Sequence, residues 1–572
     1  MVKFRLLILF AVLASTAFAY QYPVKNVKGL HSASFAEMRP DHFHSGVDIK
    51  TDGVQGKPIV AAADGYISRV SLTPAGYGLA LYVTHSKQGT MTVYGHLSKF
   101  EKSVEQFVQQ FRYEHRRHSV DITLQPDQFP VKAGQVIGYS GNTGNSFGPH
   151  LHYELRNAAG THTYNIIRRG LFRPNDNIAP RLLALHYIEV DTLDGVAVEA
   201  APRTFTIAQN KRGFAVSGTI SVGRNGYFLL ECRDNQSNNA SSRFGIYRAS
   251  QRVDGVLNFE YRMDGYAFAD TRACNLVSHY ARQQGAKCEV IRIAQTTGAP
   301  DYLYRGTVNR GVISARAGQK RTVEIEVEDD CGNRSKLQLS VVGKADNAIF
   351  KPSMPDSAVV ASKDRGVFVR DRGACVYVGK HSYYAPTFCA VRASGQVPQI
   401  DGVQVLSESY VVLDPDTPLQ LPVTVSIDAR VPAELATKCC IALKNSKGRY
   451  GYLGGYYAGG GRVYTTTRKA GEMVVVADTV APTIRPNWKS GANLTSAKRI
   501  SFRVSDNFSG IGSYELYIDG EWKSLNYSPL SAVLQHNLDK PLAAGEKTTH
   551  TLRLKVTDNM GNYTIFEDTF YR

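Results

Sequence analysis

Short stretches of alternating apolar and polar residues, separated by turns of Asp, Asn, Gly and Ser, fill the chain from about residue 173 to its end. Residues 322–327 form one such stretch and residues 551–556 another. A period of two puts every second side chain on the same face, as in a β-strand with one buried side. The pattern therefore predicts a mostly β protein.

A repeated phrase follows these strands. Residues 327–333 read Val-Glu-Asp-Asp-Cys-Gly-Asn, residues 556–562 read Val-Thr-Asp-Asn-Met-Gly-Asn, and the segments beginning at Val504 and Cys232 echo them. A strand that ends in a turn with Asn or Gly in the left-handed conformation is typical of immunoglobulin-like sandwiches. Calcium binding by these acidic turns is an alternative, but the turn itself explains the Asp and Asn residues.

The chain has 572 residues, more than one hydrophobic core usually serves, so several domains are expected. Histidines thin out after about residue 173, and Ala481-Pro482 lies in a linker-like segment. The predicted divisions are a signal peptide at 1–19, an antiparallel β domain at 20–172 with a helical insertion at about 98–129, an immunoglobulin-like β domain at 173–345, a β domain of uncertain type at 346–480, and an immunoglobulin-like β domain at 481–572.

The first 19 residues have the features of an export signal. Lys3 and Arg5 precede an apolar run from Leu6 to Ala14, and a small-x-small pattern ends at Ala19. A membrane anchor is the alternative, but the apolar run is too short to span a bilayer and no later segment resembles a membrane span. We expect an exported protein of the periplasm or cell envelope.

The predicted insertion contains an amphipathic helix. Val104, Phe107, Val108 and Phe111 have the i, i+3, i+4, i+7 spacing of one helix face. Two histidines follow this helix pattern and are interpreted as part of a solvated helix end, namely His115 and His118. Three other histidines of the first domain are interpreted as ordinary polar residues. They are His31, His42 and His85.

Two histidines stand at the centre of the first domain. His150 and His152 lie at i and i+2 in the run His-Leu-His-Tyr-Glu-Leu, which predicts a β-strand. Their side chains then point to the same face, about 6–7 Å apart along the strand. Such a pair can bind a metal, or one ring can bind the metal while the other transfers protons; structural histidines are the alternative.

Two further segments carry residues of the same chemistry. His44-Ser-Gly-Val-Asp48 is predicted to be a strand, with Gly46 leaving room between the histidine and the carboxylate. Val93-Tyr-Gly-His-Leu97 places His96 on a short apolar strand. Two histidines and one carboxylate leave a tetrahedral zinc ion with one open position, as catalytic sites require.

In this order, H-x-x-x-D, Y-x-H-L and G-N-T-G…G-P-H-L-H resemble the lysostaphin-like zinc metallopeptidases of family M23, which cut peptidoglycan. The resemblance covers about residues 28–160. It implies that His44, Asp48 and His152 bind Zn²⁺ and that His96 and His150 are catalytic residues that handle protons. The arrangement with β domains behind the peptidase is similar to that of Bacteroidetes-type envelope proteins, for which a D-alanyl–diaminopimelate bond is the expected substrate.

The expected activity is that of an exported zinc endopeptidase that hydrolyses peptidoglycan cross-links. Zinc would acidify its bound water and polarise the scissile carbonyl. The chain contains no H-E-x-x-H glutamate, so an imidazole must accept the proton, and its ordinary pKa near 6.5 suits that task. Two alternatives remain: a non-catalytic envelope scaffold that activates other wall hydrolases, and a peptidase that acts on proteins. A missing motif residue would mark the scaffold, and all five are present.

The net charge bears on the binding partners of the protein, and the cysteine content bears on whether it forms disulfides. The formal net charge is +17, of which Lys3 and Arg5 leave with the signal peptide. An anionic envelope polymer explains this charge better than nucleic acid, because no basic run or nucleic-acid motif is present; a merely solvated surface is the third interpretation. All eight cysteines lie between Cys232 and Cys440, and disulfides are permitted after export, but their pairing stays open.

Overall fold

The computed structural model describes residues 20–210, 213–236, 243–345, 357–538 and 548–572; the predicted signal peptide, 1–19, lies outside them. The described chain is mostly β, as predicted, and nearly all strand pairs are antiparallel. None of the described helices is long and apolar enough to cross a membrane. The helices are α1 (Lys102–His115), α2 (Cys274–Val277), α3 (Tyr280–Gln283), and the 3₁₀ turns η1 (Phe268–Ala273), η2 (Asp301–Leu303), η3 (Asn309–Gly311) and η4 (Ala433–Lys438).

The first sheet carries the predicted metal and catalytic residues. Its main path runs in the order β1-β2-β10-β6-β5-β4-β7, so β10 is a central strand between β2 and β6. The strands are β1 (His31–Ala33), β2 (Val47–Lys50), β3 (Pro58–Val60), β4 (Gly65–Leu72), β5 (Leu79–His85), β6 (Thr90–Phe100), β7 (Val120–Thr123), β8 (Pro130–Val131), β9 (Val136–Ser140), β10 (His150–Asn157), β11 (His162–Tyr164) and β19 (Gly265–Ala267).

Helix α1 occupies the segment in which the sequence predicts an amphipathic helix. The carboxylate of Glu101 accepts a hydrogen bond from the Ser103 backbone N–H at 2.9 Å, which caps the first turn. Val104 and Val108 are buried against the first core. The helix ends at Arg116 in the left-handed conformation, with φ of 47°.

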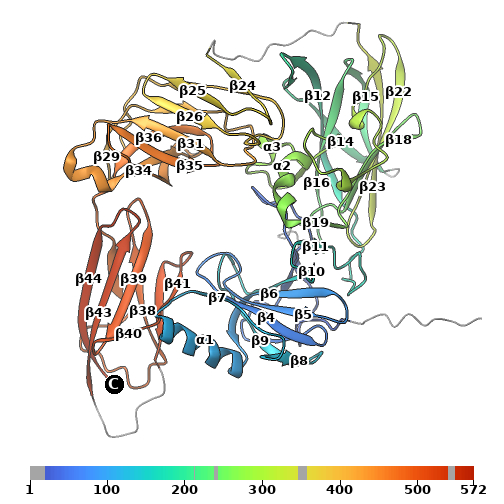
Figure 1. Ribbon diagram of the computed structural model, residues 1–572. Helices are drawn as coiled ribbons and strands as arrows, with labels where there is room; N and C mark the ends of the chain where they lie inside the picture. The colour runs from blue at the N-terminus through green and yellow to red at the C-terminus, as the bar shows by residue number, and fades with distance from the viewer. Residues whose placement is uncertain (1–19, 211–212, 237–242, 346–356, 539–547) are drawn as a thin grey trace, which may run out of the picture.

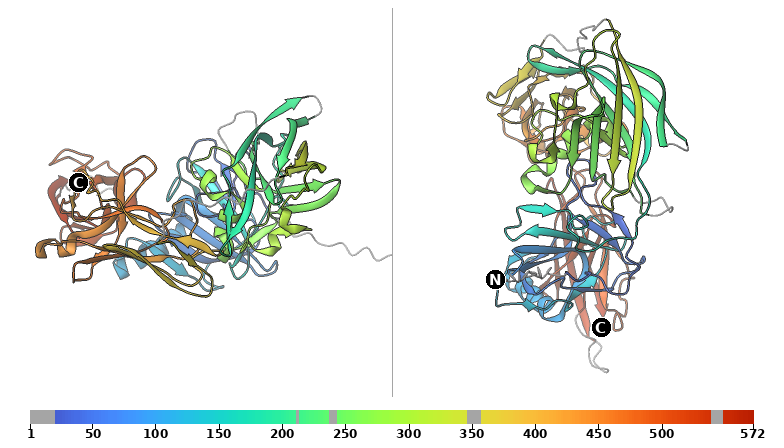
Figure 2. Two further views of the ribbon diagram at one scale, coloured as in Figure 1. Left: turned by 90° about the horizontal axis from the view of Figure 1, so that it is seen from above. Right: turned by 90° about the vertical axis from the view of Figure 1, so that its right-hand side faces the viewer.

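The second unit contributes one strand to the first sheet. Strand β19 lies in the middle of the second unit's sequence, yet it pairs with β11 of the first sheet, and one hydrophobic core extends through both units. Figures 1 and 2 show the second unit's sheet stacked directly on the first unit. The second sheet contains β12 (Arg181–Leu193), β13 (Val196–Glu199), β14 (Arg203–Asn210), β15 (Gly213–Val222), β16 (Gly226–Arg233), β17 (Arg248–Val253), β18 (Val256–Arg262), β20 (Glu289–Arg292), β21 (Tyr304–Arg305), β22 (Lys320–Glu328) and β23 (Arg334–Gly343).

The third unit packs a five-stranded sheet and a six-stranded sheet around a core of its own. A separate strand pair, β24 with β27, lies beside them. The strands are β24 (Val359–Ala361), β25 (Val367–Asp371), β26 (Ala374–Val378), β27 (Thr387–Cys389), β28 (Val391–Ala393), β29 (Gln404–Val405), β30 (Tyr410–Val412), β31 (Val423–Asp428), β32 (Cys439–Lys444), β33 (Tyr450–Gly454), β34 (Tyr456–Tyr457), β35 (Arg462–Thr467) and β36 (Gly471–Ala477).

The fourth unit packs two four-stranded sheets face to face around a third core. In β43 the buried side chains of Leu552, Leu554 and Val556 alternate with outward ones, as the sequence pattern predicts. The strands are β37 (Thr483–Pro486), β38 (Arg499–Ser505), β39 (Ile511–Ile518), β40 (Glu521–Lys523), β41 (Asn526–Ser528), β42 (Val533–Asn537), β43 (Thr549–Asp558) and β44 (Tyr563–Tyr571).

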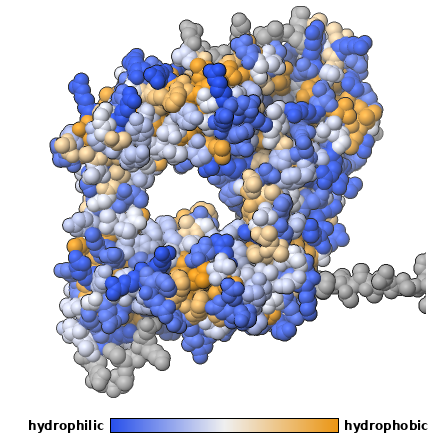
Figure 3. Space-filling view, viewed as in Figure 1, coloured by the Kyte–Doolittle hydropathy of each residue, from blue (hydrophilic) through white to orange (hydrophobic). Residues whose placement is uncertain are grey.

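The four units close into a ring. The fourth unit returns to α1 of the first, where the Arg112 guanidinium donates to the Leu525 carbonyl at 2.8 Å. Figure 1 shows the fourth unit beside α1, and Figure 3 shows an opening through the middle of the molecule. Segments about four hundred residues apart in sequence are therefore in direct contact.

Candidate metal and catalytic site

Strand pairing brings Asp48 and His152 together. Strand β10 lies between β2 and β6, and His152 is directly opposite Asp48 on one side and Gly95 on the other. Side chains opposite each other on neighbouring strands are separated by only about 5 Å, so the register alone places this carboxylate against this imidazole. His150 and His152 do share one strand, as predicted.

His44 reaches the same point from a loop, and here the prediction of a strand from His44 to Asp48 is wrong. Strand β2 begins only at Val47. Gly46 was expected to leave room between His44 and Asp48, but the structure requires glycine there because the backbone of β10 lies against it. A Cβ atom at Gly46 would lie 2.2 Å from the Tyr153 carbonyl oxygen of β10, so any side chain would push the two segments apart.

Three potential metal ligands converge. His44 Nε2 lies 3.0 Å from His152 Nδ1 and 3.1 Å from Asp48 Oδ1, and His152 Nδ1 lies 2.9 Å from the same oxygen. Ligand atoms at the 2.0–2.1 Å distances typical of zinc are separated by about 3.3 Å in a tetrahedron. The three residues are buried, with 3% to 9% of their surfaces exposed. Their spacing and chemistry fit one zinc ion.

Hydrogen bonds fix which nitrogen of each ring can bind the metal. His44 Nδ1 lies 2.8 Å from the Ser34 carbonyl oxygen, which can only accept, so Nδ1 carries the proton and Nε2 is the free donor atom. His152 Nε2 lies 2.7 Å from Glu154 Oε1, which leaves Nδ1 free in the same way. These are the two nitrogens that face Asp48.

Glu154 is a residue that the sequence reasoning missed. It is fully buried, and it accepts hydrogen bonds from Tyr77 OH at 2.5 Å, Ser45 Oγ at 2.6 Å and Arg156 Nε at 2.6 Å. Burial acts to raise its pKa, but the charges and hydrogen bonds of Arg156 and His152 outweigh burial and hold the pKa well below the usual value. The signal was available: Glu154 stands two residues after His152, so its side chain lies on the same face of the strand as the two histidines.

His96 and His150 lie beside this cluster. Their ring centroids are 4.7 Å apart, and His150 Nε2 lies 3.6 Å from Asp48 Oδ1. Neither belongs to the group whose ligand atoms all lie within 4.8 Å of one another, which contains only His44, Asp48 and His152. The structure thus places all five predicted residues together but separates them into two sets.

The glycine-rich loop before β10 orients the second pair of rings. His96 Nδ1 donates to the Thr143 carbonyl at 2.7 Å, and His150 Nδ1 donates to the Gly148 carbonyl at 2.8 Å. Each ring therefore presents a free Nε2. Burial, and then the neighbouring histidine rings, lower the pKa of His96 to about 3. His96 also has a left-handed backbone, with φ of 59°, where β6 departs from regular pairing with β5.

The other histidines named in the sequence analysis of the first unit differ in their exposure to solvent. His115 is exposed, as the sequence interpretation holds, and His42 is exposed as well. His31 and His85 are buried, and His85 hydrogen-bonds the Asp64 carbonyl at 3.0 Å. The interpretation of His118 as part of a solvated helix end is wrong, because its ring packs against the fourth unit.

Other candidate features lie elsewhere. All eight cysteines are free thiols.

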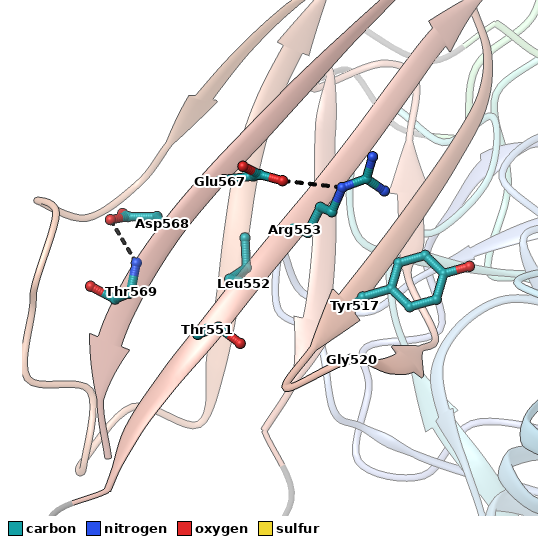
Figure 4. A pocket seen from close by; sticks show the side chains of 8 residues that line it. All are labelled: Tyr517, Gly520, Thr551, Leu552, Arg553, Glu567, Asp568 and Thr569. Atoms are coloured by element: carbon teal, nitrogen blue, oxygen red, sulfur yellow. Dashed lines mark hydrogen bonds and ion pairs between the residues drawn. The ribbon is translucent and has the colours of Figure 1, made fainter.

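A surface pocket of about 700 Å³ lies on β39, β43 and β44 of the fourth unit, where Figure 4 shows Arg553 paired with Glu567. Both partners are largely exposed. This pocket holds no histidine and no cysteine, so it offers nothing for the chemistry expected of the histidine site.

Comparisons with known proteins agree with the position of the site. Residues 42–113 and 111–164 match the family described as Peptidase family M23, and residues 397–478 match the Zu5-like domain. The ranges matched to Peptidase family M23 contain the three proposed metal ligands and the two other histidines of the site. The range matched to the Zu5-like domain lies within the segment for which the sequence predicted a β domain of uncertain type.

Individual relatives cover the same part of the chain. The DD-carboxypeptidase/endopeptidase Mpg of Neisseria meningitidis serogroup B is 36% identical over 114 residues, which are 20% of this chain and 20% of Mpg. The chain thus spans about a fifth of the length of the curated relatives it matches.

Solved structures match the same region. The catalytic domain of the prophage-encoded M23 protein EnpA from Enterococcus faecalis is 26% identical, with 25% of this chain and 88% of that chain covered and a TM-score of 0.18. A zinc containing peptidase from Vibrio cholerae is 27% identical, with 24% and 37% covered and a TM-score of 0.19.

Proposed function

We propose that the chain is a zinc-dependent endopeptidase that hydrolyses peptide cross-links of peptidoglycan, because residues 42–113 and 111–164 match peptidase family M23. The observation that carries the proposal is the buried cluster of His44, Asp48 and His152 beside the separate pair His96 and His150. Two nitrogen donors and one carboxylate oxygen are the ligand set of a catalytic zinc site with an open position.

His44, Asp48 and His152 would hold the ion through Nε2, a carboxylate oxygen and Nδ1. Zinc supplies Lewis-acid polarisation of the scissile carbonyl and makes water a stronger acid. Ser34 and Glu154 would orient the two ligand rings through the hydrogen bonds described above.

His96 and His150 would carry out the proton transfers. Each ring has its Nδ1–H committed to a backbone carbonyl, so its Nε2 is free to accept a proton or, once protonated, to donate one. Burial lowers the pKa of His96, so this ring is neutral at pH 7 and a weaker base than a free imidazole. The proton accepted at one Nε2 would be returned to the leaving amine.

The substrate assignment rests on the relatives. Mpg is named as a DD-carboxypeptidase/endopeptidase, and we extend that class of bond to this chain. D-alanyl–diaminopimelate is the proposed cross-link. An anionic wall polymer also suits a chain with a formal net charge of +17. The proposal places the protein in the periplasm or cell envelope, in keeping with the export signal expected from its first 19 residues.

Digestion of purified, cross-linked peptidoglycan tests the function. Mass spectrometry of the soluble products should reveal new D-alanyl carboxyl termini and new diaminopimelate amines, with the sugar backbone intact. The matched control is the His152→Ala chain, which should release none. Products cut at the sugar bonds, cleavage of a protein substrate alone, or no products from zinc-loaded chain would each contradict the proposal.

A further inference from the structure

Two clusters of three aspartates recur at equivalent places in the second and fourth units. One consists of Asp176, Asp234 and Asp329, and the other of Asp478, Asp506 and Asp558. Within each cluster the ligand atoms lie within 4.8 Å of one another. In both clusters all the candidate ligand atoms are carboxylate oxygens, and none belongs to the histidine site.

The two clusters match contact by contact. In the fourth unit Asn562 Nδ2 donates to Asp558 Oδ2 at 2.7 Å and to the Asp478 carbonyl at 2.9 Å. In the second unit Asn333 Nδ2 donates to Asp329 Oδ2 at 2.8 Å and to the Asp176 carbonyl at 3.2 Å. The first aspartate of each cluster opens a short linker segment, Asp-Asn-Ile-Ala-Pro180 in one case and Asp-Thr-Val-Ala-Pro482 in the other.

The turn interpretation from sequence does not account for the charge at the second cluster. Asp478 is fully buried and Asp558 is 4% exposed. Among the described residues, no Lys, Arg or His forms an ion pair with Asp478, Asp506 or Asp558. A turn needs one carboxylate, whereas three converging carboxylates without a cation repel one another.

Two buried polar atoms at this cluster are left without a partner among the described residues. Asp506 Oδ2 accepts hydrogen bonds from the Phe508 and Gly510 amides, but Asp506 Oδ1 has none. Ser509 is 3% exposed and its hydroxyl also has none. The Ser509 amide donates to Asp478 Oδ2 at 3.1 Å, which places the Ser509 backbone at the cluster. Unpaired buried oxygens are costly unless they bind a ligand.

We propose that Asp478, Asp506 and Asp558 hold one calcium ion and that Asp176, Asp234 and Asp329 hold a second. Carboxylate, hydroxyl and carbonyl oxygens are the ligands that Ca²⁺ prefers, at about 2.3–2.6 Å, so oxygens on opposite sides of the ion are separated by about 5 Å. The absence of nitrogen and sulfur donors from both clusters argues against zinc.

Calcium at these places would join each linker to the unit that follows it. Asp478 follows β36 of the third unit, while Asp506 and Asp558 belong to the fourth. Asp176 lies between β11 of the first unit and β12 of the second. Each ion would therefore stiffen one junction of the ring.

Calcium binding to the full, zinc-loaded chain tests the inference. Native mass spectrometry and calorimetric titration with CaCl₂ in millimolar Mg²⁺ should give two ions per chain. Asp506→Asn should remove one ion, and Asp176→Asn with Asp506→Asn should remove both. Glu521→Gln, which removes one exposed charge from the same unit as Asp506, is the matched control and should keep two. A stoichiometry below two in the unmodified chain would overturn the proposal, whatever the variants do.

Thermal unfolding separates an ion site from a simple turn. Without calcium, Asp506→Asn should leave the melting temperature unchanged or raise it, because the amide keeps the oxygen that accepts from Phe508 and Gly510 and removes one repelling charge. With calcium, only the unmodified chain and Glu521→Gln should gain the full stabilisation. A lower melting temperature for Asp506→Asn in both conditions, with no calcium effect on the unmodified chain, would identify a turn alone.

Discussion

At the residue scale, the carboxylate of Glu154 connects the proposed metal ligands to the protein interior. It lies between His152 Nε2 on one side and Arg156 Nε on the other, at 2.7 Å and 2.6 Å. The tautomer of His152, and therefore the nitrogen that faces Asp48, depends on this contact. Tyr77 stacks on the His152 ring at 5.0 Å between centroids and fixes its plane.

Glu154→Gln should weaken zinc binding without removing a ligand. The amide is a poorer acceptor for the His152 N–H and leaves Arg156 without its buried partner, and such outer contacts typically change metal affinity about 10- to 100-fold. A competition titration with a chromophoric chelator measures the effect. Glu114→Gln, at an exposed position of α1, should bind zinc as the unmodified chain does. Equal affinity in both variants would show that Glu154 does not support the metal site.

At the element scale, β19 makes the first unit dependent on the second. It pairs with β11, and its Tyr266 is buried against Phe43 with its hydroxyl donating to the Phe43 carbonyl at 2.9 Å. Phe43 immediately precedes the proposed ligand His44. The loop that carries this ligand therefore packs on a side chain more than two hundred residues away in sequence.

A fragment of residues 20–172 should be less stable than one of residues 20–345. The shorter fragment loses Tyr266 and the rest of the shared core, and truncating one buried aromatic residue alone costs about 3–5 kcal/mol. Urea denaturation followed by circular dichroism compares the two. Zinc content should follow stability, so the longer fragment should retain the ion. Equal midpoints for the two fragments would show that the first unit folds independently of β19.

The elements that sequence predicts best are those fixed by local pattern. The helix at Lys102–His115 and the strand that carries His150 and His152 follow from side-chain period alone. The β-branched residues Val47 and Ile49 suggested a strand that also included His44. In the structure the strand begins only at Val47, and Gly46 packs against the backbone of β10, so His44 lies in a loop. Long-range contacts, such as β11 with β19 or His118 with the fourth unit, leave no periodic trace in either segment, so only the folded chain reveals them.

At the scale of the whole molecule, His118 helps to close the ring. Its Nε2 donates to the Tyr514 carbonyl at 2.9 Å and its Nδ1 accepts from the Leu525 amide at 2.9 Å, which requires the neutral ring. Trp522 stacks on the ring at 4.9 Å between centroids. Burial lowers the pKa of His118 to about 4.

Acid should open the ring. An undocked His118, with a pKa near 6.5, binds a proton as the pH falls, whereas the docked ring stays neutral down to about pH 4, so docking weakens between these values. Small-angle X-ray scattering should show a larger radius of gyration at pH 5 than at pH 7. His118→Gln, which can donate and accept without titrating, should reduce the change, and His115→Ala should keep it. A radius that does not depend on pH in the unmodified chain would contradict this account.

The zinc content and cleavage rate of two variants on one strand test the central claim most directly. His152→Ala removes a proposed ligand and should lose zinc together with activity. His150→Ala removes a proposed proton-transfer group, so zinc should remain near one ion per chain while turnover of cross-linked muropeptides falls about 10²- to 10⁴-fold. Loss of zinc from His150→Ala with its retention in His152→Ala would show that the two roles are exchanged and that the assignment is wrong.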